Sequence, residues 1–403
     1  MKYYKNTELA KIYGTSEKSV RNWIQAAREG KLELQLYEEK GKFLIENTAK
    51  NTFTIETLVA KGRKYKNTRG HKVITPLPKF YDLYSPKQIV DIMANLDIYR
   101  ESPVQYTYFN SGAQRWDKYT QNLLNQTTPN SLTNTLQLLD LNLGYIDALL
   151  GDCSGVNIID IGVGNALPIR GVLEHFIEKG LLKRYIGIDI SKELLHIAKQ
   201  NISSWFKDEV LFEGHIRNIN YDRFDDLLVA ESFGAEANST VNLVFFLGGT
   251  ISNMRQPNHA LSTIHDSMGK RDFLFISKKL DTEKSRRYFE MAVQGNQEIN
   301  LVLKLLNIDE SLYTLEQFFD EQKMVRQARA RLNVAIAIKF QLYDQERVIE
   351  FNKDETILLW RARHQTALET LKQFDANGFE LLQATRSKDQ EYLSLISKIK
   401  TGN

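Results

Sequence analysis

The sequence predicts an α/β protein with a Rossmann-like parallel sheet, preceded by a small helical module. An apolar, β-branched run at 156–161 ends at Gly162 and Gly164, as a buried strand entering a tight turn would. Apolar residues at helical spacing follow, and a second strand at 185–188 ends at Asp189. A strand, turn, helix and strand in this order form the βαβ unit of such a sheet.

The turn in this unit has the residue types of a nucleoside site. Glycines let the backbone approach a ligand, and a carboxylate after the second strand can accept hydrogen bonds from ribose hydroxyls. The third glycine of the dinucleotide fingerprint is missing, which favours S-adenosylmethionine over NAD. The alternative is an ordinary glycine-containing turn without a ligand. The predicted cofactor residues are Asp160, Gly162, Gly164, Asn165 and Asp189.

The composition is that of an ordinary globular protein, with 403 residues of which 42% are hydrophobic and 26% are charged. A single cysteine, Cys153, excludes an internal disulfide and cysteine-rich metal clusters. The seven histidines lack metal-ligand spacing, so no metal site is predicted. Neither a signal peptide nor a long uncharged apolar stretch is evident, and we therefore expect a cytoplasmic protein without membrane segments.

Charge is distributed unevenly along the chain. Residues 1–79 contain 17 lysines and arginines against 8 acids, whereas the remaining residues contain 36 against 42. A basic module joined to an acidic body suggests a polyanionic partner for the module. The stretch 61–79 is basic and interrupted by glycine and proline, as linkers are. The expected organisation is a module at 1–60, a basic linker at 61–79 and a large domain at 80–403.

The first 60 residues show the pattern of two short helices and a hairpin. A helix is expected at 7–13, then a break at Gly14, then a second helix that follows the N-cap Ser16 and ends at Gly30. Alternating leucines at 32–36 and a returning apolar stretch predict the hairpin. The whole resembles the small winged helix-turn-helix modules of bacterial and phage regulators, which implies that the second helix contacts DNA.

The outward face of this second helix carries the residues that we expect to bind DNA. Arg21, Asn22 and Gln25 are types that bond to base edges, and Lys18 can neutralise a phosphate. The alternative is a solvated face on a small protein-interaction module. Helix-turn-helix proteins are often dimers, so a homodimer is the default expectation.

Two motifs give the large domain a family resemblance. Tyr108-x-x-x-Gly112-Ala113-x-x-Trp116 is similar to the Tyr-Asp-x-x-Gly-Ser-x-Leu-Phe segment of the histidine-specific Nα-methyltransferases of ergothioneine biosynthesis. The stretch 246–253, FLGGTISN, is similar to that family's Phe-Leu-Gly-Ser-Thr-Ile-Gly-Asn. The resemblance covers roughly residues 100–395. It implies a Rossmann-like class I methyltransferase sheet, S-adenosylmethionine as cofactor, and a substrate lobe from about 80–150 and 282–350.

The same resemblance implies an acceptor site. The family's substrate-binding positions fall at or near Tyr108, Gly248, Asn253 and Tyr288. Methyl transfer mainly requires a deprotonated nucleophile held in line with the cofactor. Tyr108 is the candidate catalytic residue for taking a proton from an amine, and the alternatives are that it only orients the acceptor or packs in the core. The alternative roles are a turn or helix cap for Asn253 and an ordinary surface or core tyrosine for Tyr288.

Three departures from the family pattern bear on the substrate. Gly214-His215 stands where the family has Gly-Asp, whose acid lies near the adenine, and Asn125 stands about where a tyrosine contacts the amino-acid substrate. The family's late Glu-x-Ser-x-Lys, which recognises imidazole, falls on residues 360–364, WRARH. Loss of the acid and the hydroxyl removes the hydrogen bonds that distinguish imidazole from an apolar ring. Free histidine is therefore not the expected substrate.

Apolar runs also predict the later elements of the large domain. They indicate strands at 210–212, 241–247 and 271–278, a long helix at 285–306, and closing strands at 335–342 and 356–360. Ligands bind at the carboxyl ends of the strands in such sheets, so the turn at Gly248 would lie beside the cofactor.

The sequence leaves two functions open. DNA itself is not the expected acceptor, because the turn after the fourth strand lacks the Pro-Pro-aromatic motif of amino-methylating DNA enzymes and Cys153 is misplaced for a cytosine-C5 nucleophile. The first hypothesis is an S-adenosylmethionine-dependent methyltransferase that N-methylates a small amine or amino-acid-like acceptor and is coupled to a DNA-binding module. The alternative is a transcriptional regulator whose methyltransferase-like domain senses a ligand without turnover.

Overall fold

The computed structural model of the protein describes residues 3–13, 15–39, 41–46, 48, 50–52, 54–55, 58, 70–228, 240–283, 299–320, 324–343 and 345–400. The chain forms two compact units. The first comprises Met1–Val104, Gln297–Phe318 and Gln327–Trp360, and the second comprises Gln105–Asn296, Phe319–Arg326 and Arg361–Asn403. Each unit is therefore built from segments that are far apart in the sequence.

A seven-stranded mixed sheet forms the centre of the second unit. Its strand order is β15-β16-β9-β8-β5-β6-β7. The strands are β5 (Gly155–Ile161), β6 (Leu182–Asp189), β7 (Phe212–Ile216), β8 (Thr240–Phe246), β9 (Phe273–Lys279), β15 (Phe379–Arg386) and β16 (Tyr392–Ile399). Neighbours from β7 to β9 are parallel, whereas β16 runs antiparallel to both β9 and β15. This is a Rossmann-like sheet, as predicted.

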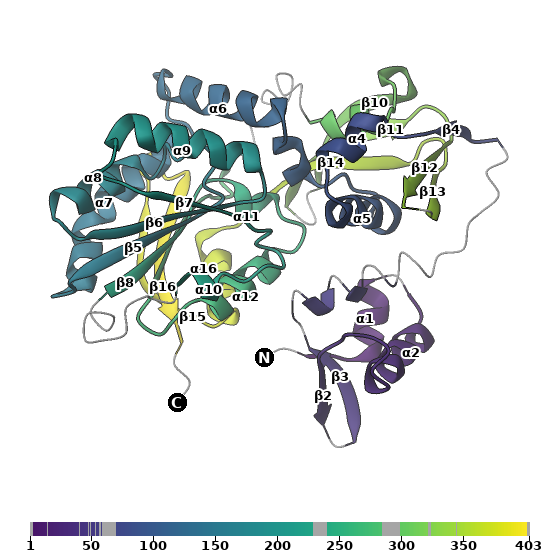
Figure 1. The fold of residues 1–403 in the computed structure, drawn as a ribbon, viewed down its shortest axis with the longest axis horizontal. Helices are drawn as coiled ribbons and strands as arrows, with labels where there is room; N and C mark the ends of the chain where they lie inside the picture. The colour runs from purple at the N-terminus through teal and green to yellow at the C-terminus, as the bar shows by residue number, and fades with distance from the viewer. Residues whose placement is uncertain are drawn as a thin grey trace. The chain divides into compact units, whose positions relative to one another are not determined.

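Helices cover both faces of this sheet (Figure 1). Successive strand residues face opposite sides, so Ile158 packs with one helical layer and Ile159 with the other. One layer contains α7 (Ser131–Leu150), α8 (Arg170–Glu178) and α9 (Lys192–Phe206). The other contains α10 (Asp225–Leu228), α11 (Thr250–Asn253), α12 (Pro257–Ser267) and α16 (Ala367–Ala376). The 3-10 helix η2 (Val104–Tyr108) and α6 (Ser111–Leu124) precede α7.

The carboxyl ends of the parallel strands meet at one edge of the sheet. β6 and β7 lie on one side of β5, and β8 and β9 lie on the other, so the chain order reverses between β5 and β8. In open α/β sheets, ligands bind outside the carboxyl ends of the strands at such a point of reversal. The turns that follow β5, β6 and β8 are therefore the place where the fold predicts a site.

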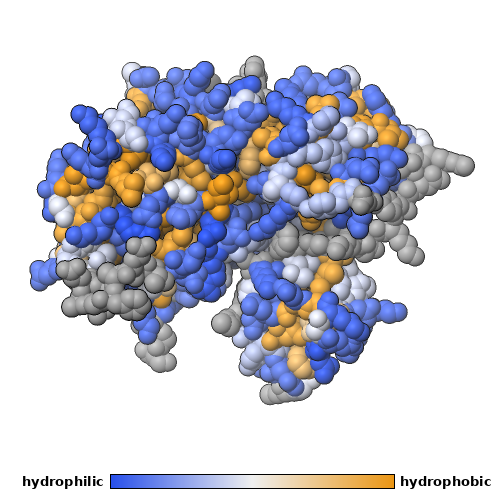
Figure 2. Space-filling model, viewed as in Figure 1, coloured by the Kyte–Doolittle hydropathy of each residue, from blue (hydrophilic) through white to orange (hydrophobic). Residues whose placement is uncertain are grey.

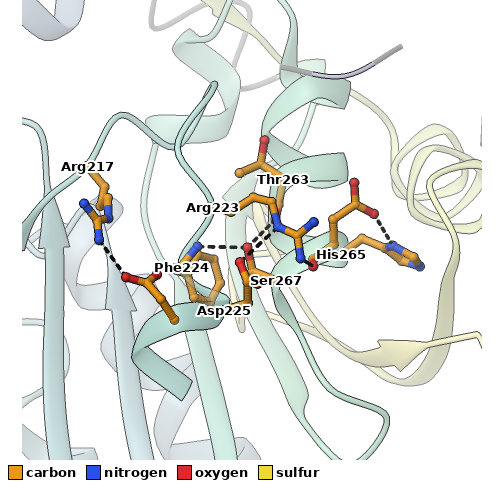
Figure 3. Close-up of polar contacts among 9 residues, drawn as sticks. Arg217, Arg223, Phe224, Asp225, Thr263, His265 and Ser267 are labelled. Atoms are coloured by element: carbon orange, nitrogen blue, oxygen red, sulfur yellow. Dashed lines mark hydrogen bonds and ion pairs between the residues drawn. The ribbon is translucent and has the colours of Figure 1, made fainter. Parts of the chain in front are cut away.

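The connection that leaves β7 is fixed to α12 by a polar network that is buried in part (Figure 3). The backbone N–H of Phe224 donates to the hydroxyl of Ser267 (3.0 Å), and that hydroxyl donates to the carbonyl of Thr263 (2.7 Å). Arg223 donates to the carbonyl of Asp266 at the end of the same helix. Phe224 is also buried in the core layer that contains α12. The connection before α10 therefore helps to cover that face of the sheet, although it is neither a strand nor a helix.

Two further three-stranded sheets lie largely in the first unit. Their strand orders are β10-β11-β14 and β13-β12-β4. The strands are β4 (Lys72–Ile74), β10 (Tyr313–Asp320), β11 (Val325–Leu332), β12 (Ile336–Leu342), β13 (Gln345–Phe351) and β14 (Thr356–Arg363). The helices of this part are α4 (Pro78–Leu83), α5 (Pro86–Ala94), the π-helix η1 (Asn95–Tyr99), α15 (Leu301–Leu305) and the 3-10 helix η4 (Glu310–Leu312).

Several expected strands differ from the structure. Strands do form near 335–342 and 356–360, but they belong to the smaller sheets, and β15 and β16 close the main sheet instead. The reason is that an apolar run identifies a strand, whereas its partner is set by long-range packing. The third strand of the main sheet is β7 rather than residues 210–212, because its pairing with β6 extends towards Asp189.

The structure also differs from the sequence prediction in the linker and in the substrate lobe. Residues 72–74 of the stretch 61–79 form β4, which pairs in parallel with β12, so a basic composition interrupted by glycine and proline did not reveal an edge strand. Helix α7 was expected in the substrate lobe, but it packs on the main sheet through apolar residues such as Leu139 and Ile146. Of the long helix expected at 285–306, the structure describes α15, and residues 284–298 lie outside the described residues.

The N-terminal module contains α1 (Asn6–Ile12), α2 (Glu17–Arg28) and a three-stranded sheet of β1 (Tyr3–Tyr4), β3 (Lys42–Glu46) and β2 (Leu36–Glu39). Ser16 caps α2 by accepting a hydrogen bond from the N–H of Ser19 (3.1 Å), as predicted. Leu9, Val20 and Ile45 meet in its core. Figure 2 shows hydrophobic residues in the middle of the visible face of this module and hydrophilic residues around them.

The turn between α16 and β15 provides a test of the fold. Gly378 has a φ of +85°, and a Cβ at this position would lie 2.8 Å from Nε2 of His265. Gly378→Ala should lower the free energy of unfolding by about 1–3 kcal/mol, because alanine both strains the backbone and clashes with the imidazole. Urea denaturation followed by circular dichroism measures the change.

Gly144→Ala is the matched control. Gly144 lies on α7, where a Cβ would meet no atom within 4 Å. Alanine is the better helix former by roughly 0.5–1 kcal/mol, so this variant should be at least as stable as the wild type. Equal losses of stability in both variants would contradict the geometry described for Gly378.

Candidate active site

The turn after β5 requires glycine at two positions. Gly162 and Gly164 have φ angles of +69° and +55°, in the left-handed region that favours glycine. The N–H of Gly162 donates to the carbonyl of Ile188 on β6 (2.7 Å). A Cβ at Gly164 would lie 3.2 Å from the indole Nε1 of Trp116. Both glycines therefore shape one tight turn at the carboxyl edge of the sheet.

Asp189 ends β6 beside this turn. Its Oδ2 accepts a hydrogen bond from the N–H of Gly164 (3.2 Å), and its Oδ1 accepts one from the N–H of Ser191 (3.0 Å). The residue is 8% exposed. Burial raises the pKa of its carboxyl to about 6, although the backbone donors act in the opposite direction. Each carboxylate oxygen has more than one lone pair, so Asp189 retains the capacity to accept hydrogen bonds from the hydroxyls of a ligand.

Asp160 and Asn165 hold the same turn through their side chains. Asp160 is 3% exposed and accepts a hydrogen bond from the hydroxyl of Tyr185 (3.2 Å). Burial raises the pKa of its carboxyl to about 7. Asn165 donates to the carboxylate of Asp117 on α6 (2.8 Å), and its carbonyl accepts from the side chain of Asn201 on α9 (3.0 Å). Asp160 thus connects the end of β5 to β6, and Asn165 connects the turn to α6 and α9.

Three aromatic side chains lie beside the glycine turn. The ring centroid of Trp116 is 5.4 Å from that of Tyr108 and 5.6 Å from that of Tyr119. The hydroxyl of Ser191 donates to the carbonyl of Tyr108 (2.7 Å). Burial, followed by the charge of Asp189 and the proximity of Tyr119, raises the pKa of Tyr108 to about 12. The phenol of Tyr108 is therefore protonated at neutral pH.

The turn after β8 lies against the turn after β5. Gly248 has a φ of +75°, and its N–H donates to the hydroxyl of Ser277 on β9 (3.2 Å). A Cβ at Gly162 would lie 3.4 Å from the hydroxyl oxygen of Thr250, the first residue of α11. Asn253 ends the same short helix and is partly exposed. The structure therefore brings together the two segments that carry the predicted cofactor and acceptor residues.

The remaining predicted positions differ in what the structure says of them. Tyr288 lies outside the described residues. Asn125 is the exposed C-cap of α6. His215 lies on β7, where burial lowers the pKa of its imidazole. Residues 360–364 span the end of β14 and the residue after it.

Sequence reasoning missed two residues that organise this site. The hydroxyl and the N–H of Ser191 hold Tyr108 and Asp189, and the carboxylate of Asp117 holds Asn165. Both residues stand next to positions that the sequence did single out: Ser191 is the N-cap of α9 two residues after Asp189, and Asp117 directly follows Trp116. Their side-chain partners are distant in the sequence, however, and a local pattern does not reveal them.

The structure also bears on metal binding and membrane insertion, for the part of the chain that it describes. In that part, no group of three or more His, Cys, Asp or Glu side chains is arranged to hold a metal ion. None of the helices described there combines the length and the apolar character that crossing a bilayer requires.

Helix α2 of the N-terminal module exposes the four residues that were predicted to contact DNA. Lys18, Arg21, Asn22 and Gln25 are all exposed. The side chain of Gln25 donates to the carboxylate of Glu29 one turn later (2.6 Å). The opposite face of the helix packs into the core of the module, so the four residues share the solvent side.

Comparison with known proteins gives one family match and several structural similarities. The family model described as "histidine-specific methyltransferase, SAM-dependent" matches residues 90–398. The chain is similar to the structure of an S-adenosylmethionine-dependent methyltransferase from Clostridium acetobutylicum (9% identity, 72% of this chain and 99% of that one, TM-score 0.36). It is also similar to magnesium protoporphyrin IX methyltransferase from Synechocystis with bound SAH (10% identity, 74% and 98%, TM-score 0.39). No curated protein sequence matches the chain.

The buried carboxyl of Asp160 makes stability depend on pH. Its pKa of about 7 lies above the unfolded value of roughly 3.9, so the folded state binds the proton more tightly and loses stability as pH rises from about 4 to about 7. Asp160→Asn keeps the shape and an acceptor for Tyr185. We expect this variant to be more stable than the wild type at pH 8 and about equally stable at pH 4, as measured by urea denaturation.

The control for this experiment is Asp152→Asn, at an exposed carboxyl between α7 and β5. It should leave the pH dependence of unfolding as it is in the wild type. A loss of stability at pH 8 in Asp160→Asn would mean that the ionised carboxylate, rather than its burial, determines the contribution of this residue.

Proposed function

Because the chain belongs to the family of histidine-specific, S-adenosylmethionine-dependent methyltransferases, whose model matches residues 90–398, we propose that it N-methylates a small amine or amino-acid-like acceptor. The family makes the protein an S-adenosylmethionine-dependent methyltransferase. The observation that carries the proposal is the hydrogen bond from the N–H of Gly164 to the carboxylate of Asp189. It combines a ribose acceptor with a turn that a ligand can approach closely, at the switch point of the sheet.

We assign the cofactor to Gly162, Gly164 and Asp189. The residues fit an adenosyl group, because Gly162 and Gly164 add no side chains of their own to the turn and the buried carboxylate retains acceptor capacity for ribose hydroxyls. Asp160 and Asn165 support this assignment indirectly by fixing the turn. Bound S-adenosylmethionine supplies a methyl group that its sulfonium makes electrophilic.

We assign the acceptor to Tyr108, Gly248 and Asn253, with Tyr288 added by resemblance. The phenol of Tyr108 stays protonated near neutral pH, so its proposed role is to donate a hydrogen bond and orient the acceptor rather than to take a proton from it. The amide of Asn253 can donate and accept, which suits the amine or carboxylate of an amino acid. The role of these residues is therefore positioning, which is the main requirement of methyl transfer.

Free histidine is not the acceptor that we propose. Residues 360–364, WRARH, offer neither the acid nor the hydroxyl that would pair with an imidazole. Without those partners the buried ring nitrogens would lose their hydrogen bonds on binding. An acceptor with a different side group fits this chain better.

We further propose that the N-terminal module is a winged helix-turn-helix that binds DNA and targets or regulates the enzyme. Support comes from the excess of basic residues at 1–79 and from the exposed Lys18, Arg21, Asn22 and Gln25 on α2. A homodimer would place two such helices on neighbouring half-sites. We also propose a cytoplasmic location for the protein.

Titration calorimetry with S-adenosylmethionine, followed by an acceptor screen for release of S-adenosylhomocysteine, tests the proposed enzyme function. Cofactor binding with release on an amine acceptor would support it. Binding without release on any acceptor would instead favour a transcriptional regulator that senses a ligand. No binding at millimolar cofactor would contradict the roles assigned to Gly164 and Asp189.

Tyr108→Phe tests the orienting role of the phenol. Removing the hydroxyl should lower kcat for the best acceptor by about tenfold, the effect of one lost hydrogen bond, while the Kd of the cofactor changes little. Because the pKa of Tyr108 is about 12, the wild type should show no tyrosine ionisation in its rate profile between pH 7 and 10. Steady-state kinetics and calorimetry provide both readouts.

Tyr119→Phe is the control for Tyr108→Phe, because Tyr119 belongs to the same aromatic group but is more exposed. It should retain wild-type kcat. If kcat rises in the wild type with an apparent pKa between 7 and 10 that Tyr108→Phe abolishes, then Tyr108 acts as a base and the orienting role is wrong.

Salt-dependent binding tests the DNA proposal. The full chain should bind a fluorescent duplex of random sequence, with log Kd rising linearly with log salt concentration. Lys18→Gln should reduce that slope by about 1, the loss of one phosphate contact. Lys270→Gln, at an exposed turn before β9, should leave the slope unchanged. Absence of binding by the wild type at low salt would refute DNA recognition by the module.

A further inference from the structure

A buried lysine near the carboxyl edge of the main sheet has no counter-ion in the part of the chain that is described. Lys278 lies on β9, next to Ser277, whose hydroxyl accepts the N–H of Gly248. The lysine is 2% exposed. Its ammonium donates to the amide oxygen of Gln365 (2.5 Å), and among the described residues it forms no ion pair. A neutral amide is thus the partner of a buried charge.

The hydrogen-bonding capacity of this ammonium is not used up. An ammonium carries three donors, and Gln365 accepts from one of them. Glu369 is the acidic group that acts electrostatically on Lys278, but its carboxylate accepts from the N–H and hydroxyl of Thr366 (2.8 and 2.9 Å) and caps α16. Because a buried cation without an anion is unfavourable, the site favours an anionic partner from outside the protein.

His364, next to Gln365 in the chain, adds a second unsatisfied group. Its Nδ1 is buried and has no hydrogen-bond partner. Burial lowers the pKa of His364 to about 3, and the charged groups that add to this effect are Arg326, Lys279 and Lys278. All three are cationic. Next to Gln365, the partner of Lys278, the chain therefore holds a second buried group with unused hydrogen-bonding capacity.

We propose that Lys278, with His364 beside it, binds an oxyanion, a carboxylate or a phosphate, carried by the acceptor of the methyl group. This inference rests on the proposed function, since it names the chemistry of the acceptor. The oxyanion supplies acceptors for the remaining ammonium donors and a negative charge for Lys278 to pair with. A neutral imidazole can present an Nδ1–H to the same oxyanion. Lys278 alternates with Ser277 along β9 and faces the same side as Ile276, which lies in the layer of α11, so the oxyanion would lie on the side of the sheet that carries Asn253.

Pairs of acceptors that differ in one anionic group test the inference on the full chain. Glycine is compared with glycinamide, and phosphoethanolamine with ethanolamine, for release of S-adenosylhomocysteine. The anionic member of at least one pair should have a kcat/KM roughly tenfold or more above that of its neutral partner. The pair that shows the difference identifies carboxylate or phosphate. Release at equal kcat/KM within both pairs would overturn the inference and leave the proposed function intact.

Calorimetry gives a readout that does not require turnover. Acetate and inorganic phosphate are titrated into the protein at pH 8.5, in buffers of different ionisation enthalpy. Burial, followed by the charge of Arg363, lowers the pKa of Lys278 to about 8, so part of the amine is neutral at this pH. Binding of an anion favours the ammonium form and should therefore take up protons from the buffer.

Lys278→Met assigns that uptake to one residue. Methionine keeps the length and apolar stem of lysine, and the variant should lose the proton uptake and bind the anion at least about tenfold more weakly. Lys270→Met, at the exposed turn before β9, should behave as the wild type. Anion binding that is unaffected by Lys278→Met, or no binding and no uptake in the wild type, would overturn the inference. If anion binding depends on Lys278 but no acceptor is methylated, the proposed function is refuted and the anion site is supported.

Discussion

The hydrogen bond between the Asp189 carboxylate and the N–H of Gly164 is the contact on which the candidate site depends. It joins the end of β6 to the glycine turn that follows the neighbouring parallel strand β5, and so fixes that turn. The loop that begins at Asp189 also carries Ser191, which holds the carbonyl of Tyr108. Asn165 in turn connects the glycine loop to α6. Segments that are far apart in the sequence therefore meet around one buried carboxylate.

This arrangement has an energetic cost that the fold tolerates. Asp160 and Asp189 are both buried, and within the described residues neither forms an ion pair with a basic side chain. Burial raises the pKa of each carboxyl, so ionisation at neutral pH opposes folding. A core built only for stability would place apolar side chains here. The retention of two such groups at the switch point is the kind of local conflict that functional sites show.

Local patterns predicted those parts of the structure that local forces determine. The β5 turn, β6 and the cap at Ser16 follow from apolar periodicity, glycine and side-chain capping, and the structure contains all three. The two motifs of the large domain were also found by sequence alone, and the structure places them beside the glycine turn. Such features need only neighbours in the chain.

Features that depend on distant partners were not predictable in the same way. The apolar runs that become β12 and β14 look like closing strands, and nothing local distinguishes them from β16. The roles of Asp160 and Lys278 depend on which side of the sheet each side chain faces and on which residues pack there. The sequence shows that both residues carry a charge, but only the folded structure shows that both are buried.

The strand order has a further consequence for biosynthesis. β16 lies between β9 and β15, and the first unit takes its segments 297–318 and 327–360 from the chain between β9 and β16. While the ribosome synthesises that stretch, the edge of β9 has no neighbour, and an open, apolar strand edge invites pairing with other nascent chains. Chaperone dependence in the cell would follow from topology alone.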